Sequence, residues 1–242
     1  MAIALRAAGK PGWTVRPAIL GTLVAALALS ACQPKGPAGA GQGASSSPSS
    51  PGSAGKPVAT AVSAPGAPGP VSIGFAQDMS VHHEQALAMA GLARANGSPA
   101  IQAVGEGILR QQLRELGYLQ GWLLLWAQPA ASAEDDMPWM RQAYRQAGQR
   151  DADFERFIER CVAGQPMPGL ATQDELDALS RLRGLAFDAR FIVLMVRHHE
   201  AALVMARFAF EHAELEPVRQ FAAAMGAEQR QEIAWLMRLA PR

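Results

Sequence analysis

Two nearly identical stretches decide the fold expected for this 242-residue chain: MSVHHEQALAMA at residues 79–90 and MVRHHEAALVMA at residues 195–206. Nine of the sixteen positions from Phe75 to Ala90 carry the same residue 116 positions later. Within each copy the Met, His and Ala residues recur at spacings of three, four and seven, which places them on one face of a helix. The two stretches therefore predict two equivalent helices in an internally duplicated fold.

The duplication continues beyond these helices. Residues 112–116, QLREL, correspond to residues 229–233, QRQEI, at an offset of 117. Each half is therefore expected to consist of a His-bearing helix, a turn, and a second helix with a Gln-x-x-Glu motif. Two such hairpins form a four-helix bundle. No strand pattern is found, so the expected fold class is all-α, a four-helix bundle of two duplicated helical hairpins with short extra helices between them.

Glycine, proline and acidic clusters set the expected helix ends. Long helices are expected at 72–95, 99–126, 187–213 and 217–239, and shorter ones at 139–147, 151–162 and 173–183. Thr172 and Glu175 have the spacing of a capping box, which predicts the start of the last of the short helices.

Residues 1–31 have the features of an export signal. Basic residues precede an apolar run at 18–28 that is too short to remain as a membrane-spanning helix. The run ends in Leu29-Ser30-Ala31-Cys32, which resembles the lipidation box of bacterial lipoproteins; an ordinary secretory peptide is the alternative. Lipidation at Cys32 would anchor the protein to a membrane facing the periplasm. Gln33, by analogy with lipoprotein sorting, favours the outer membrane.

The remaining chain divides into a tether and a domain. Residues 32–70 are almost entirely Gly, Ala, Ser and Pro, which cannot bury enough apolar surface to offset the entropy of ordering. A flexible chain of this length reaches roughly 35 Å. Residues 71–242 are long enough to form one domain with its own core.

Charge excludes one class of partner. From Asp78 onward the chain has 21 acidic residues against 17 Arg and no Lys, a net charge of −4 with neutral His. Nucleic-acid binding would need a clustered basic face, so it is not expected. With Cys32 lipidated, Cys161 is the only remaining thiol, and we expect it to be a small buried residue rather than a ligand.

Imidazole and thioether groups share one face of each predicted His-bearing helix, and these eight residues are the candidate metal ligands: His82, His83, His198, His199, Met79, Met89, Met195 and Met205. Neutral imidazole combined with thioether favours copper, above all Cu(I). The alternative is ordinary packing, because methionine stripes and single buried histidines are common in cores. Repetition favours metal, since burying four imidazoles leaves many polar nitrogens to satisfy.

The second helix of each half carries candidate supporting residues, namely Gln112, Glu115, Gln229 and Glu232. Each Glu could accept a hydrogen bond from a ligand imidazole or bind metal itself, or else pair with Arg at the surface. No catalytic residue is identified. Leu87 and Leu203 replace the second His of the zinc-peptidase motif, and the Glu-x-x-His of di-iron bundles is absent.

The sequence resembles the bacterial family named domain of unknown function 305, over about residues 74–239. The motifs that carry the resemblance are the two His-His stretches, Gln112-x-x-Glu115, Met167-Pro168-Gly169, Phe187-Asp188-x-x-Phe191 and Gln229-x-x-Glu232. The resemblance implies a ferritin-like four-helix bundle, export, and the copper binding and resistance associated with some members. The sequence departs from the family pattern at Leu119, Leu170 and Leu236, where many relatives carry Met.

These observations predict an exported, lipid-anchored protein that binds a transition metal, most of all copper, to sequester it or pass it on. A metal-dependent oxidase in a ferritin-like cavity is one alternative. A non-metal envelope interaction protein, with the His pairs as packing, is another. The expected partners are the metal ion, a membrane through the lipid, and either a second copy or an envelope protein.

Overall fold

The structure is a computed structural model that describes residues 66–134, 136–148, 151–161, 165 and 167–240. The predicted export signal at 1–31, Cys32 and most of the predicted tether lie outside the described residues. Seven helices occur in the described part of the chain: α1 Pro70–Asn96, α2 Pro99–Leu125, α3 Pro138–Ala147, α4 Ala152–Glu159, α5 Gln173–Arg181, α6 Gly184–His212 and α7 Glu216–Leu239. The predicted all-α class is confirmed.

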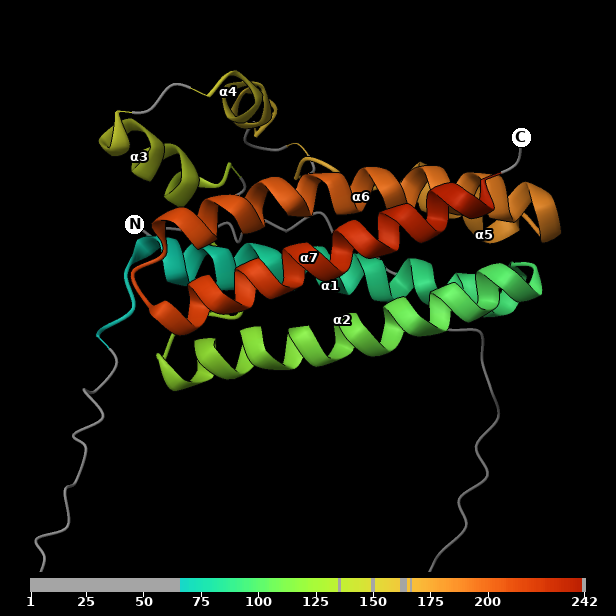
Figure 1. The fold of residues 1–242 in the computed structure, drawn as a ribbon, viewed down its shortest axis with the longest axis horizontal. Helices are drawn as coiled ribbons and strands as arrows, with labels where there is room; N and C mark the ends of the chain where they lie inside the picture. Colours follow the sequence, from blue (N-terminus) through green and yellow to red (C-terminus); the bar gives the residue numbers. More distant parts are fainter. Residues whose placement is uncertain (1–65, 135, 149–150, 162–164, 166, 241–242) are drawn as a thin grey trace, which may run out of the picture. The chain divides into compact units, whose positions relative to one another are not determined.

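Four long helices form two hairpins (Figure 1). α1 packs against α2, α6 packs against α7, and the hairpins meet mainly through α1 and α6, which run in opposite directions. α2 and α7 contact each other over a shorter stretch. α3 packs on α1, α4 packs on α6, and α5 contacts both α1 and α6. The predicted pairing of helices into two hairpins is therefore confirmed.

Local chemistry explains where several helices begin and end. Pro70 occupies the first turn of α1, where its missing N–H costs nothing. The capping box predicted at Thr172 is present: its hydroxyl accepts from Glu175 N at 3.2 Å and Glu175 Oε2 accepts from Thr172 N at 3.0 Å. α6 begins three residues earlier than predicted, because Leu182 and Arg183 are extended and the helix starts at once after them.

Two carboxylates from the second hairpin cap helices of the first. Glu214 accepts from Val71 N at 3.0 Å and Ser72 N at 2.9 Å, at the start of α1. Asp188 accepts from Ser98 N at 2.9 Å, at the start of α2. Negative charge at a helix N-terminus is favourable because it meets unpaired N–H groups and the positive end of the dipole. The two hairpins are thus joined at both ends by capping contacts.

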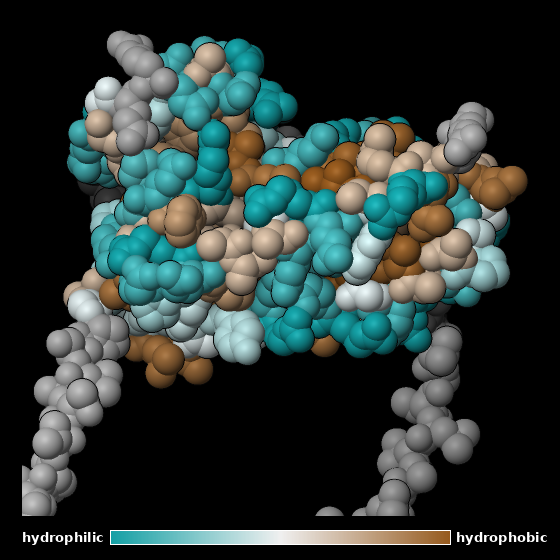
Figure 2. Space-filling model, viewed as in Figure 1, coloured by the Kyte–Doolittle hydropathy of each residue, from teal (hydrophilic) through white to brown (hydrophobic). Residues whose placement is uncertain are grey.

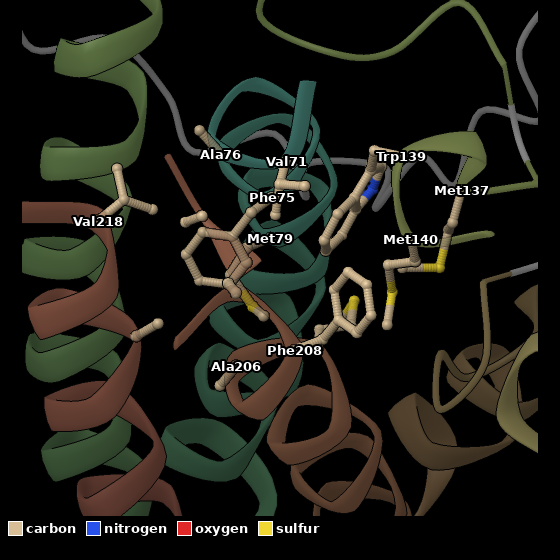
Figure 3. Packing of buried hydrophobic residues seen from close by; sticks show 14 of the residues in the cluster. Val71, Phe75, Ala76, Met79, Met137, Trp139, Met140, Ala206, Phe208 and Val218 are labelled. Atoms are coloured by element: carbon tan, nitrogen blue, oxygen red, sulfur yellow. The ribbon is translucent and has the colours of Figure 1, made fainter. Parts of the chain in front are cut away.

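The apolar interior consists of two clusters. The first cluster surrounds Phe75 and includes Met79, Trp139, Phe208 and Met205, with rings of Phe75, Trp139 and Phe208 in edge-on contact (Figure 3). Asp78 holds Trp139 in place by accepting from its Nε1 at 2.6 Å. Asp78 thus anchors α3 rather than capping a His-bearing helix.

The second cluster lies toward the other end of the long helices and includes Met89, Met195, Phe187 and Phe191. The rings of Phe187 and Phe191 stack with centroids 5.7 Å apart. The two clusters therefore occupy the regions on either side of the His-His stretches, along α1 and α6.

Cys161 lies in the first cluster, as expected of a small buried residue. Its Sγ is 3.5 Å from Met137 Sδ, and burial raises the pKa of the thiol to about 12. The thiol is therefore held in its neutral form, which is a poor metal ligand.

The exterior is mixed in polarity, with apolar and polar residues interspersed on the face shown in Figure 2. Among the described residues, no helix has the length and apolar character needed to cross a membrane.

Candidate metal centre

The four paired histidines come together between α1 and α6, and all four are completely buried. His82 and His198, which occupy equivalent positions in the duplication, have ring centroids 3.7 Å apart and planes inclined by 39°. The ring centroids of His198 and His199 are 5.9 Å apart. We call these four side chains the imidazole layer. It places both predicted His pairs at one point in the interior.

Three of the four rings are held by hydrogen bonds through Nε2. His83 Nε2 lies 2.7 Å from Glu115 Oε2, and His199 Nε2 lies 2.7 Å from Glu232 Oε2. His198 Nε2 lies 3.0 Å from the backbone oxygen of His82. His198 donates from Nε2 to a backbone oxygen, and His83 and His199 donate from Nε2 when their carboxylate partners are ionised, so that Nδ1 of these rings then carries the lone pair.

The opposite ring nitrogens have no partners. Nδ1 of all four histidines and Nε2 of His82 make no hydrogen bond. The backbone of Met79 lies near His83 and favours its protonated form, without completing a hydrogen bond of normal geometry. An unpaired buried polar atom costs about 1–3 kcal/mol. One of the two His82 nitrogens carries a proton in the neutral ring, so these atoms offer four lone pairs, one from each histidine. Four unpaired lone pairs in one small region indicate a place for a group that accepts them.

The amides of Gln112 and Gln229 are also buried without partners, at both the oxygen and the nitrogen. The two residues are equivalent in the duplication and each precedes its Glu by three positions. The predicted supporting residues therefore divide into two kinds. Glu115 and Glu232 engage imidazoles directly, whereas Gln112 and Gln229 contribute unpaired polar atoms.

Burial favours the neutral forms of His82, His83, His198 and Glu115. It holds the pKa of His82 and of His198 well below 6.5, with further lowering by neighbouring imidazoles. Burial is also the main cause that lowers the pKa of His83 to about 3, and it raises the pKa of Glu115 to about 7. The three imidazoles are therefore neutral near pH 7, the state in which a ring nitrogen can bind a metal.

The predicted thioether residues are all fully buried, but they are divided. Met79 and Met205 lie in the first cluster, and Met89 and Met195 lie in the second. Leu119 joins the first cluster and Leu236 the second, each fully buried. The sequence did not anticipate this split. It follows from the opposite directions of α1 and α6, which bring the residue before one His pair level with the residue after the other.

The described side chains do not already form a coordination shell. Among residues 66–134, 136–148, 151–161, 165 and 167–240, no group of three or more His, Cys, Asp or Glu is arranged to hold an ion. His82 and His198 lie ring against ring instead. The donor types fit a soft or borderline metal, and binding one requires the rings to turn.

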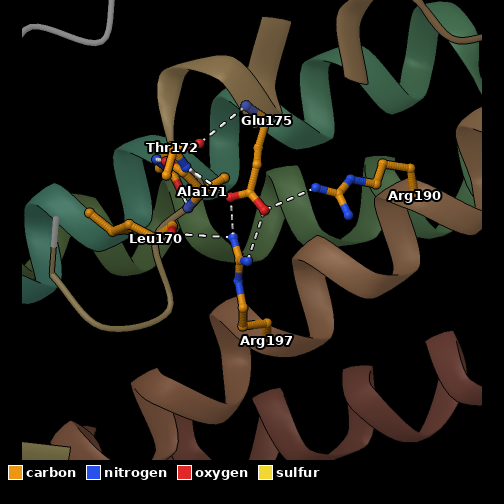
Figure 4. Close-up of polar contacts among 7 residues, drawn as sticks. Leu170, Ala171, Thr172, Glu175, Arg190 and Arg197 are labelled. Carbon is orange, nitrogen blue, oxygen red and sulfur yellow. Dashed lines mark hydrogen bonds and ion pairs between the residues drawn. The ribbon is translucent and has the colours of Figure 1, made fainter. Parts of the chain in front are cut away.

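Glu175 forms ion pairs with two arginines of α6, one of which adjoins His198 in sequence (Figure 4). Arg197, the neighbour of His198, donates to both oxygens of Glu175 at 2.9 and 2.6 Å, and Arg190 donates to Glu175 Oε1 at 2.9 Å. These pairs hold the pKa of Glu175 at about 2. Only the capping-box role of Glu175 could be predicted, because its arginine partners are distant in sequence.

The loop before α5 is fixed just as closely against α1 and α6. Gln85 accepts from Ala171 N at 2.6 Å and donates to Ala171 O at 2.9 Å. Gly169 has φ +90, and a Cβ there would lie 2.3 Å from Ala201 Cβ and 3.1 Å from Arg197 O. Glycine is therefore required for the loop to approach the backbone of α6 beside the imidazole layer.

Comparison with known proteins places the chain in a family. The model of the family described as domain of unknown function (DUF305) matches residues 72–240. The chain belongs to this family. The resemblance drawn from the doubled His-His motif is thereby confirmed. A comparison with curated proteins found no match.

Solved DUF305 structures show the same fold. A DUF305 protein from Streptomyces coelicolor, a presumed secreted protein, is 29% identical with a TM-score of 0.58, over 70% of this chain and 91% of that one. A DUF305 fragment from Deinococcus radiodurans is 22% identical with a TM-score of 0.54, over 72% and 97%.

Two further matches are CopM in its Cu(I)-bound and Cu(II)-bound forms. Both are 22% identical and cover 69% of this chain and 94% of CopM, with TM-scores of 0.47 and 0.48. Similarity at this level carries no argument about the present chain, and the copper described is that of CopM.

Proposed function

We propose that this DUF305 protein binds copper in the imidazole layer, to sequester the ion or pass it on, within a four-helix bundle of the ferritin type. The observation that carries the proposal is the set of four buried imidazoles whose Nδ1 atoms all lack partners, with two rings held by carboxylates through Nε2. A carboxylate on the far nitrogen fixes the ring and makes the free nitrogen a better donor.

The proposed ligands are the Nδ1 atoms of His82, His83, His198 and His199. Glu115 and Glu232 orient their rings, and the thioethers supply soft donors from either side, Met79 with Met205 and Met89 with Met195. Neutral nitrogen and thioether donors without a thiolate suit Cu(I). No side chain is assigned a catalytic role.

We also propose that the protein is exported and anchored at Cys32, with residues 1–31 removed, residues 32–70 as the tether and residues 71–242 as the binding domain. The acidic domain would then bind copper outside the cytoplasm, and the lipid on Cys32 would hold the protein at the membrane. The most informative check is mass spectrometry of the mature protein, which should carry lipid on Cys32 and lack the preceding residues.

The binding proposal is tested by anaerobic Cu(I) titration of the purified protein against a chromogenic competitor. The wild-type protein should bind at least one Cu(I), and His82→Ala/His198→Ala should lose most of that binding. His212→Ala is the matched control, because His212 ends α6 and contacts Phe208 rather than the imidazole layer. A wild-type stoichiometry near zero would rule the proposal out.

A further inference from the structure

The crossing of α2 and α7 contains a line of contacts from the surface to the imidazole layer. Glu228, half-buried on α7, lies within hydrogen-bonding reach of the Glu115 carboxyl group on α2. Glu115 is almost fully buried and reaches His83 at 2.7 Å. Glu228, Glu115 and His83 therefore connect solvent to a buried imidazole.

The charges around this line are predominantly negative. Glu115, Glu228 and Glu232 all lie within electrostatic range of one another. Two basic groups, His199 and Arg114, act on Glu115, and Arg114 also acts on Glu228. The Arg114 guanidinium contacts Gln111 Oε1 as well. Carboxyl groups in contact repel unless a proton or a cation lies between them. The negative charge of the crossing would therefore attract cations.

Unpaired amide groups provide a second, independent indication of a ligand. Gln112 is fully buried and lies one turn before Glu115 on the same face of α2, and Gln229 lies in the same relation to Glu232 on α7. Neither amide has a hydrogen-bond partner. These two buried amide oxygens, each one turn from a buried carboxyl group, offer oxygen ligands to a cation that has left the solvent.

Only one half of the duplication carries the surface carboxylate. The position equivalent to Glu228 is Gln111, which donates to Glu115 Oε1 at 2.8 Å. Besides His83, Glu115 therefore contacts a neutral amide on its own helix and a carboxyl group on the opposite helix. This asymmetry gives the crossing one acidic side that faces the solvent.

We propose that the α2–α7 crossing is the entrance by which a metal cation reaches the imidazole layer, with Glu228 as the carboxylate that first receives it. The ion then passes Glu115, Gln112 and Gln229 before the imidazoles bind it. This inference rests on the proposed function. It adds a kinetic role for a residue that need not touch the ion in its final position.

Stopped-flow mixing of the purified protein with Cu(II), followed by quenching of tryptophan fluorescence, tests the entrance. Glu228→Gln should slow association about five-fold, as expected for loss of local electrostatic attraction, and slow dissociation equally, so that Kd is unchanged. Arg114→Gln should accelerate association. The control is Glu159→Gln, which removes the same charge from the exposed end of α4 and should change neither rate.

The outcomes separate the two proposals. Equal association rates for wild type and Glu228→Gln, with normal copper binding, would overturn the entrance and leave the binding function standing. A changed Kd with an unchanged association rate would also overturn it, because Glu228 would then act as a ligand. A wild-type protein that binds no copper would remove both proposals.

Discussion

The imidazole layer and the two apolar clusters are buried to the same degree but are stabilised differently. Phe75 and Phe187 have their rings packed against other rings, so burial is favourable for both. His82 and His198 are equally inaccessible, yet their Nδ1 atoms are unpaired and burial disfavours their charged forms. The difference teaches that the clusters hold the fold together, whereas the layer is maintained at a cost to stability, as expected of a binding site.

Acid should reveal this difference with the largest effect. The pKa values of His82, His83 and His198 are lowered in the fold, so below pH 6.5 the unfolded chain binds more protons and stability falls. Glu115 acts in the opposite direction: its pKa is raised to about 7 in the fold, so the folded state binds one more proton there than the unfolded chain does. Unfolding therefore takes up about two protons in total, which should lower the free energy of unfolding by about 3 kcal/mol for each pH unit between pH 6 and 5.

Urea unfolding of the metal-free protein at pH 7, 6 and 5 measures this slope. Saturation with copper at pH 6 should restore stability, because the ligand binds only the folded state. A free energy of unfolding that stays constant across this pH range would show that the histidines are not held neutral.

Truncation in an apolar cluster should have an effect of similar size that does not depend on pH. Ile101 on α2 is 1% exposed and lies in the second cluster. Ile101→Ala should destabilise by about 3 kcal/mol through lost burial and a residual cavity. Copper stoichiometry should be unchanged. If the variant were fully folded but bound no copper, the apolar clusters and the imidazole layer would not have separate roles.

Replacing histidines of the imidazole layer by an apolar residue should raise the stability of the metal-free protein rather than lower it. In His82→Leu/His198→Leu the unpaired nitrogens are removed, so the metal-free protein should be more stable at pH 7 by about 1–2 kcal/mol. Its stability should also vary less with pH, and it should not bind copper. Thermal unfolding with and without copper measures both effects. Marked destabilisation of the variant would indicate that the rings are structural.

The smallest effect is expected for the ion pairs of Glu175 with Arg190 and Arg197. Glu175→Gln removes the charge that Arg190 and Arg197 share, and the loss should be about 1 kcal/mol at pH 7, because exposure to solvent screens the pairs. The pKa of Glu175 is lowered to about 2, so this contribution is present above pH 4.5 and declines as the pH falls below it. Comparing Glu175→Gln with Asp174→Gln, an exposed neighbour, isolates the arginine pairs.

Periodicity and duplication sufficed to predict most of the fold. The spacing within residues 79–90 and its copy at 195–206 located the long helices, and the Gln-x-x-Glu repeat identified their hairpin partners. The Thr172 capping box located α5. These features are local, or repeated at a fixed offset, so a single sequence contains them.

The remaining features depend on contacts between distant segments. Glu214 caps α1 from 142 residues away, and nothing near either position in the sequence indicates it. Glu228 was missed because its equivalent is Gln111, so the repeat did not mark it. The division of the methionines required the relative direction of α1 and α6, which only the folded arrangement supplies.

The central claim is that neutral, buried imidazoles bind copper through Nδ1 while carboxylates hold Nε2. Nuclear magnetic resonance of protein labelled with ¹⁵N-histidine, titrated with diamagnetic Cu(I), tests it most directly. The account predicts that Nδ1 resonances of at least two of the four paired histidines shift on binding, while the Nε2–H groups of His83 and His199 persist. Binding through Nε2, or shifts confined to His212, would contradict it.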